Sequence, residues 1–233
     1  MEKSEIPKFI KKVFEEYPQV KCALNFSSPL QLLVASRLSA QCTDVRVNIV
    51  CEELFKKYKT AKDFANADKE ELEKAIFSCG LYHSKARDII AAAKQLEESG
   101  HFPETIEEFC SLAGGGRKIA NLMMGEIYGD QSVVIADTHC IRLSNRLGLC
   151  DSTNPVIVEK TLKKILPPNT GFHYSHAMVA HGRKICKAQN PGCENCFIKE
   201  YCEYFKDKDK NKNKDKDKNK GKEKCGIKKS SSK

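Results

Sequence analysis

The chain has 233 residues, of which 40% are hydrophobic and 30% are charged, and its formal net charge at pH 7 is +9. No apolar run approaches the length of about eighteen residues that a membrane-spanning helix needs. The first residues include Glu2 and Glu5 and lack the apolar core of a secretory signal peptide. These features argue against an integral membrane protein and against secretion.

The positive charge is concentrated at the C-terminal end of the chain. Residues 206–233 contain 13 lysines and 5 acidic residues, a net charge of +8, so residues 1–205 carry only +1. The low-complexity sequence KDKDKNKNKDKDKNKGKEK has no apolar residue to bury, which predicts disorder. The overall charge is therefore no evidence for a nucleic-acid-binding surface on the folded part, where any basic surface must be local.

Hydrophobic periodicity predicts an all-α fold, because apolar residues recur at helical spacing and no stretch alternates with period two for long. Capping residues and prolines support several of the helix starts; Ser28, for example, precedes Pro29 and has Gln31 three residues on. The expected helices cover residues 6–17, 28–38, 43–55, 68–79, 84–96, 105–112, 117–128, 141–147, 154–166 and 172–185.

The most informative stretch covers residues 105–137. Thr105 and Glu108 form a capping box, the glycines 114–116 make a turn, and a second helix begins at Arg117 and Lys118. Glycines leave backbone N–H groups exposed at a helix N-terminus, where these donors and the helix dipole attract a phosphate. The pattern is typical of a helix-hairpin-helix that binds DNA, although an ordinary turn followed by a solvated lysine has the same local sequence.

The cysteines fall into two groups. Eight of the twelve are scattered, and most of these fall among apolar neighbours, as expected for small core residues in a reducing compartment. The other four have the spacing C-x6-C-x2-C-x5-C: Cys186, Cys193, Cys196 and Cys202. Four thiolates this close in sequence bind zinc or an iron-sulfur cluster. Structural zinc usually takes two C-x2-C pairs, and only one is present, so the spacing favours a 4Fe-4S cluster and leaves zinc open.

The hairpin, the lysine, a downstream aspartate and the cysteine spacing together resemble the endonuclease III family of DNA glycosylases. The resemblance extends from about residue 6 to residue 202, and its recognisable stretches are LNFSSPLQLLVASRLSAQCTD, GLYHSKA, GRKIAN, ADTHCIRLSNRLG and HGRKIC. It implies two helical lobes with the lesion site in the cleft between them. A helical barrel lobe would cover 22–132 and contain the helix-hairpin-helix at 105–128, and an iron-sulfur lobe would combine 1–21 with 133–205.

The same resemblance implies a bifunctional DNA glycosylase/AP lyase of base excision repair that removes oxidised pyrimidines and nicks the strand 3′ to the site. Lys118 would be the nucleophile that forms a Schiff base, Asp137 the acidic partner, and the four cysteines the ligands of the 4Fe-4S cluster. From its position alone Asp137 is an ordinary helix N-cap, and both roles are compatible because one oxygen can cap while the other faces the sugar. The other implied DNA contacts are Gln41, Leu81, Gly114, Gly116, Arg117, His139 and Lys187.

Three features depart from the family pattern. The hairpin has Ala113 and Gly115 where the family motif L-P-G-V-G has proline and an apolar residue, which predicts a floppier hairpin. Ile119 replaces a residue that is commonly threonine. The loop between the first two cysteines has Lys187 as its single basic residue, which predicts a weaker grip on phosphate.

Two other functions compete with this one. A monofunctional, adenine-excising glycosylase is disfavoured by Lys118, since those relatives lack a lysine there. A helix-hairpin-helix module stapled by zinc would bind DNA without catalysis. The expected partner is double-stranded DNA with oxidised pyrimidines or abasic sites, bound by a monomer and away from membranes. The lysine-rich tail favours the nucleus if the host is eukaryotic, and the cytoplasm with the nucleoid otherwise.

Overall fold

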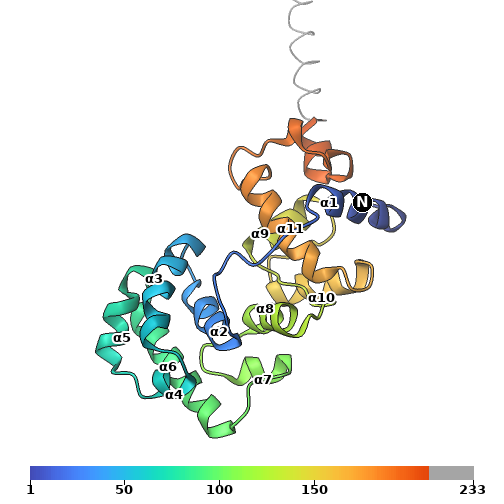
Figure 1. Ribbon diagram of the computed structural model, residues 1–233. Coiled ribbons are helices and arrows are strands. Elements are labelled where there is room, and N and C mark those ends of the chain that lie inside the picture. The colour runs from blue at the N-terminus through green and yellow to red at the C-terminus, as the bar shows by residue number, and fades with distance from the viewer. Residues whose placement is uncertain (210–233) are drawn as a thin grey trace, which may run out of the picture.

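The computed structural model describes residues 1–209, and over that range it contains helices and no strand. The all-α prediction is therefore confirmed (Figure 1). The α-helices are α1 (Ile6–Glu16), α2 (Pro29–Leu38), α3 (Asp44–Lys57), α4 (Ala61–Ala65), α5 (Lys69–Ile76), α6 (Tyr82–Ser99), α7 (Ile106–Ser111), α8 (Arg117–Tyr128), α9 (Thr138–Arg146), α10 (Pro155–Ile165) and α11 (Gly171–Lys184). Short 3-10 turns occur at η1 (Lys3–Glu5), η2 (Phe77–Cys79), η3 (Cys193–Asn195) and η4 (Lys199–Tyr201).

Most helix starts are the ones that the capping residues predict. The Ser28 side chain accepts a hydrogen bond from the backbone of Gln31 at the start of α2. Two helices, α6 and α4, differ from what the sequence predicts. Helix α6 begins at Tyr82, and Ser84 does not cap it but donates its hydroxyl to the Leu81 carbonyl at 2.9 Å. Helix α4 has only five residues, too few to show a hydrophobic period.

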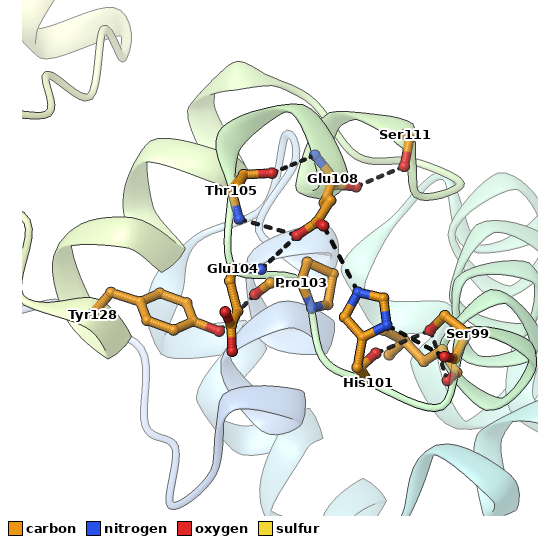
Figure 2. Close-up of polar contacts among 9 residues, drawn as sticks. Ser99, His101, Pro103, Glu104, Thr105, Glu108, Ser111 and Tyr128 are labelled. Atoms are coloured by element: carbon orange, nitrogen blue, oxygen red, sulfur yellow. Dashed lines mark hydrogen bonds and ion pairs between the residues drawn. The ribbon is translucent and has the colours of Figure 1, made fainter.

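The two helices of the hairpin are joined by polar contacts as well as by the turn. The predicted capping box of α7 is confirmed, with Thr105 and Glu108 each accepting from the other's backbone N–H at 3.2 Å (Figure 2). At the far end of α8 the Tyr128 hydroxyl donates to the Pro103 carbonyl at 2.6 Å, before α7 begins (Figure 2). The capping box thus fixes the start of α7, and the Tyr128 hydrogen bond ties the end of α8 to the segment just before it.

The buried side chains form two separate clusters. The first comes from helices α2 to α8 and includes Leu32, Leu38, Phe64, Leu72, Phe109 and Met123. The second comes from α1 and from α9 to α11 and includes Phe9, Val13, Leu143, Leu162, Tyr174 and Met178. Figure 1 shows the same grouping, with α1 beside α11 although they lie at opposite ends of the helical sequence.

The segment 133–136 connects the two clusters just before the predicted catalytic aspartate. Val134 and Ala136 belong to the second cluster, whereas Ile135 belongs to the first. Successive side chains of an extended segment point in opposite directions, so this short stretch can pack on both sides at once. As a result, Asp137 emerges where the two clusters meet.

The C-terminal part departs from one expectation. Residues 203–209 are helical, so a helix extends four residues into the segment for which composition predicts disorder. The rest of that prediction concerns 210–233, which lies outside the described residues. No helix in the described part of the chain is long and apolar enough to cross a membrane.

Candidate active site

Four of the predicted site residues line one cavity of about 710 Å³. They come from separate elements: Gln41 from the α2–α3 turn, Lys118 from α8, Asp137 from the end of the connecting segment, and His139 from the first turn of α9. Residues of α11 complete the wall. The cavity therefore lies between helices of the two buried clusters, and it has the size of a small-molecule site.

Lys118 is exposed in the first turn of α8, two residues after the N-cap Gly116. Its ammonium makes no hydrogen bond or ion pair with any other described residue, whereas most charged groups around it are paired. A lysine that is held on a helix at the edge of a cavity and has no internal partner can reach a ligand without first breaking a contact.

Asp137 is the N-cap of α9, and that part of the prediction is confirmed. Its Oδ1 accepts from the backbone N–H of Cys140 at 2.7 Å. The side chain is only partly buried and lines the cavity, so the carboxylate has an oxygen that the cap does not use. The cap also fixes the side-chain rotamer, which holds the carboxylate in place.

Burial lowers the pKa of two imidazoles near Asp137. Burial lowers the pKa of His139, and the Asp137 carboxylate opposes that shift only in part. Burial likewise lowers the pKa of His176, on α11, to about 4. The His139 ring also lies 3.1 Å from the Arg142 guanidinium and packs closely on Gly182 of α11. His139 thus lines the cavity but is held by α9 and α11.

The hairpin has contacts that the sequence did not predict. The Ala113 N–H donates to Oε1 of Gln95 at 2.7 Å, and Nε2 of Gln95 donates to the Ser111 carbonyl at 3.3 Å. A proline at position 113 would lack this N–H. Gly115 donates to the Leu112 carbonyl at 2.8 Å and has no room for a Cβ, which would lie within 3.0 Å of two backbone oxygens. The Gln95 side chain of α6 thus holds the hairpin through two hydrogen bonds to its backbone.

The glycines on either side of Gly115 differ in their conformation. Gly114 has a left-handed φ of +69°, and a Cβ there would meet Arg37 and Asp88. Gly116 is extended and open, with nothing within 4 Å of a Cβ. Gly114 and Gly116 lie with Lys118 around a hollow of about 440 Å³. This arrangement leaves the backbone at the start of α8 open to a ligand.

Arg117, predicted to contact DNA, is engaged inside the protein. Its guanidinium donates two hydrogen bonds to the Glu159 carboxylate of α10, at 2.9 and 2.6 Å. Burial alone would raise the pKa of Glu159, but the hydrogen bonds from Arg117 lower it overall. Arg117 therefore fixes α8 against α10, and its neighbour Lys118 is the free cation of the pair.

Gln41 and Leu81 share an uncommon backbone conformation. Their φ angles are +53° and +49°, in the left-handed region that non-glycine residues rarely adopt. Both side chains are exposed, and Leu81, an apolar residue, is 53% exposed. Leu81 does not line the cavity, so the structure places it on a separate loop. Non-glycine residues that are held in this strained conformation occur mainly at functional sites.

The four predicted metal-ligating cysteines lie together beyond α11. Arg146 links two of them, because its Nη1 donates to Cys186 Sγ at 3.2 Å and its carbonyl accepts from Cys202 Sγ at 3.2 Å. Burial raises the pKa of Cys196 to about 11, and the other three thiols add to that shift. Within the described residues no three His, Cys, Asp or Glu side chains are arranged as a metal site.

Lys187, the remaining predicted DNA contact, is exposed at the start of the cysteine loop. The Arg146 guanidinium binds the backbone of this loop by donating hydrogen bonds to the carbonyls of Lys187 and Ala188 at 2.8 and 2.9 Å. Arg146 therefore holds both the loop backbone and two of the thiols. It had no assigned role in the sequence analysis, although it lies in the quoted stretch ADTHCIRLSNRLG.

Three further residues near the site were not predicted. Arg183 lines the cavity and forms an ion pair with Asp44 at 2.5 Å. Lys85 is completely buried below the loops of Gln41 and Leu81. Arg183 and Lys85 fall inside the stretches HGRKIC and GLYHSKA, so the resemblance could have singled them out. His176 has no comparable signal, because a histidine in α11 is equally typical of a helix interior.

Comparison with known proteins agrees with this geometry. Residues 34–168 match the model of the HhH-GPD superfamily of base excision DNA repair proteins. The chain is 40% identical over 188 residues to endonuclease III of Synechocystis, covering 80% of this chain and 86% of the relative. It is 35% identical over 206 residues to endonuclease III of Escherichia coli, covering 88% and 97% of the two chains.

A solved structure of a trapped endonuclease III–DNA covalent intermediate superposes with a TM-score of 0.84 at 38% identity, covering 89% of this chain and 99% of that one. The helices and the cavity define a DNA glycosylase of the helix-hairpin-helix class. Within that class, the chain belongs to the endonuclease III family and is a bifunctional DNA glycosylase/AP lyase of base excision repair. The monofunctional and non-catalytic alternatives are set aside by this membership.

Proposed function

We propose that Lys118 and Asp137 are the catalytic pair and that they act on an oxidised pyrimidine nucleotide extruded from duplex DNA. The observation that carries the proposal is that both side chains line the 710 Å³ cavity, while Lys118 has no partner among the described residues. The Asp137 oxygen that does not cap α9 is available to the sugar. A nucleophile and a carboxylate on one cavity are what base removal requires.

The chemistry follows from these two groups. As the glycosidic bond breaks, its electron pair leaves with the base, and the Asp137 carboxylate stabilises the positive charge that develops on the sugar. The neutral amine of Lys118 forms a bond to C1′, and opening of the sugar ring gives an iminium. Loss of a proton from C2′ then expels the 3′ phosphate with its electron pair, which cuts the strand. Water hydrolyses the remaining imine and restores Lys118.

The nucleotide must leave the base stack before it reaches Lys118. Extrusion costs a few kcal/mol, and less for a damaged pair, which favours lesions over normal bases. We assign Gln41 and Leu81 to the space that the extruded nucleotide leaves, because both project outward from tight turns. Gly114 and Gly116 supply open backbone at the start of α8 for the phosphates, and exposed Lys187 adds a distant contact.

The four cysteines are proposed to hold a 4Fe-4S cluster. Their chemistry fits, because four sulfurs within one short segment complete the coordination of such a cluster. Cys186 accepts a hydrogen bond from the Arg146 guanidinium, and Cys196 lies against His181 Nε2; N–H donors at these two positions can stabilise sulfur charge. A cluster with four protein thiolates has no open position for substrate, so it would cross-link the C-terminal segment. Zinc would satisfy the same ligands, and iron analysis distinguishes the two.

Three coarser assignments accompany the proposal. The two buried clusters support a division into a barrel lobe, 22–132, and a cluster lobe made of 1–21 and 133–205. The proposed partner is damaged double-stranded DNA, since the trapped relative is itself a DNA complex. Binding by a monomer is part of the same proposal. The nuclear location proposed for a eukaryotic host depends on the lysine-rich tail, most of which lies outside the described residues.

Single-lesion duplexes test this function. The protein is incubated with duplexes that each contain one thymine glycol, one dihydrouracil or one adenine opposite 8-oxoguanine, and base release and strand nicking are scored separately. We expect release and nicking of the two pyrimidine lesions in one reaction. Release of adenine without nicking would contradict the proposal, and so would binding of all duplexes without any product.

A further inference from the structure

The two loops that carry Gln41 and Leu81 meet over one buried side chain. The first loop, residues 39–42, follows α2, and the second, residues 77–81, contains η2 and precedes α6. Each contains a non-glycine residue with a left-handed backbone, Gln41 in the first and Leu81 in the second, and the thiols of Cys42 and Cys79 interact between the loops. The loops are therefore neighbours in space although about forty residues separate them.

The side chain beneath them is Lys85, from the first turns of α6. Its exposed fraction is 0%, and its Nζ donates to the carbonyl of Leu38 at 2.7 Å and to the carbonyl of Cys79 at 2.9 Å. Leu38 is the last residue of α2, and Cys79 is the last residue of η2. One amine thus fastens the start of the first loop to the middle of the second.

Burying the Lys85 ammonium costs free energy unless its charge is compensated by partners. A buried ammonium is usually paired with a carboxylate, and Lys85 has no such partner among the described residues. The titratable groups that face it are the Cys42 and Cys79 thiols and the Arg37 guanidinium, none of them a carboxylate, and burial lowers the Lys85 pKa. Its counter-charges are carbonyls at two helix ends, where the helix dipole is negative. An apolar side chain would fill the space more cheaply but would leave both carbonyls without a donor.

We propose that Lys85 is a positioning residue that holds the two DNA-invading loops in a fixed relation, so that Gln41 and Leu81 enter the duplex together. The inference rests on the proposed roles of these two residues. Lys85 itself does not line the cavity and has no exposed surface with which to reach a substrate. Because both loops turn at strained residues, losing the shared anchor would let each relax on its own. A displacement of about 1 Å at such a site is enough to slow a reaction by on the order of a hundredfold.

The test compares two substrates with Lys85→Met, which keeps the length of the side chain and removes the donors. One substrate is a duplex with a single lesion pyrimidine, which needs base extrusion. The other is a single-stranded oligonucleotide with an abasic site, which has neither a base to extrude nor a second strand to invade. We expect the variant to lose at least about tenfold in kcat/KM on the duplex and less than about twofold on the single strand. Lys94→Met, an exposed lysine of the same helix, is the matched control and should match wild type on both.

The outcomes separate this inference from the proposed function. If wild type cuts neither substrate, the proposed function fails. If wild type cuts both and Lys85→Met loses equally on both, or loses nothing, the positioning role is wrong. Thermal unfolding by circular dichroism checks that the variant folds; if it does not, Lys85→Gln keeps an amide donor, and its loss must still be confined to the duplex for the proposal to hold.

A double-mutant cycle supplies the second readout. If Lys85 acts through the second loop, Lys85→Met in a Leu81→Ala background should add less than about twofold to the loss on the duplex, because the two residues then act as one unit. Full additivity of the two losses would overturn the proposal.

Discussion

The hairpin glycine at position 115 gives a prediction whose size can be worked from the structure. In Gly115→Ala, the new Cβ would lie 2.8 Å from the Leu112 carbonyl oxygen and closer still to that of Phe109. Both atoms belong to the backbone and cannot rotate away. Overpacking of this kind costs about 1–3 kcal/mol, and losing the hydrogen bond from Gly115 to Leu112 adds about 0.5–1.5 kcal/mol. The reduced entropy of the unfolded chain returns about 0.4–1 kcal/mol, so we expect a net loss of about 1–3 kcal/mol.

Gly116→Ala is the matched control, because Gly116 is extended and a Cβ there meets nothing within 4 Å. It should be neutral or stabilising by up to about 1 kcal/mol. The two variants are compared by thermal unfolding, where each kcal/mol shifts Tm by roughly 2–4 °C for a chain of this size. Equal Tm values for the two variants would refute the reasoning, and a Gly115→Ala protein more stable than wild type would show that the hairpin is not packed as described.

Three other variants test separate parts of the site. Cys196→Ser should lose iron and lower Tm, as measured by iron analysis and calorimetry; an iron-free variant with the Tm of wild type would contradict a structural cluster. Asp137→Asn should slow base release by about 10² to 10⁴ while leaving stability nearly unchanged, because asparagine caps a helix as well as aspartate does; base release at the wild-type rate would mean that the cap is its main role. Arg117→Ala leaves the Glu159 carboxylate, 2% exposed, with the weaker contacts of Lys163 and Asn121, and should cost about 1–3 kcal/mol at pH 7. In wild type the lowered pKa of Glu159 contributes stability that is present above its unfolded pKa and is lost as pH falls through the folded one. The cost of Arg117→Ala, followed by urea unfolding, should therefore shrink as pH falls below the ordinary glutamate pKa of 4.5; a cost that does not depend on pH would argue against an ion pair.

Local signals in the sequence were enough for most of the helices. Ser28 and Thr105 each accept from the backbone three residues on, so the evidence for these helix starts lies within one turn of chain. The grouping of Cys186, Cys193, Cys196 and Cys202 was equally readable, because their spacing is itself the signal. The capping role of Asp137 also follows from its position alone.

The contacts that decide how the site works are long-range and could not be read this way. Arg117 pairs with Glu159, 42 positions away, and Lys85 reaches the Leu38 carbonyl, 47 positions away. The residues next to Arg117 and Lys85 in the sequence do not predict either partner. Ala113 is the clearest case: its departure from proline predicts a looser hairpin, but the N–H it adds is bonded by Gln95, a residue without any assigned role. The effect of such a substitution on the hairpin can be predicted only when the contacts of the neighbouring helix are known.

The most direct test of the central claim is borohydride trapping on a lesion duplex. Borohydride reduces the imine between protein and sugar and leaves a stable protein–DNA complex that can be counted on a denaturing gel. With wild type we expect efficient trapping and, by peptide mapping, attachment at Lys118; with Lys118→Gln we expect lesion binding to persist and trapping to disappear. If Lys118→Gln were trapped as efficiently as wild type, another amine would be the nucleophile and the assignment of the site would be wrong.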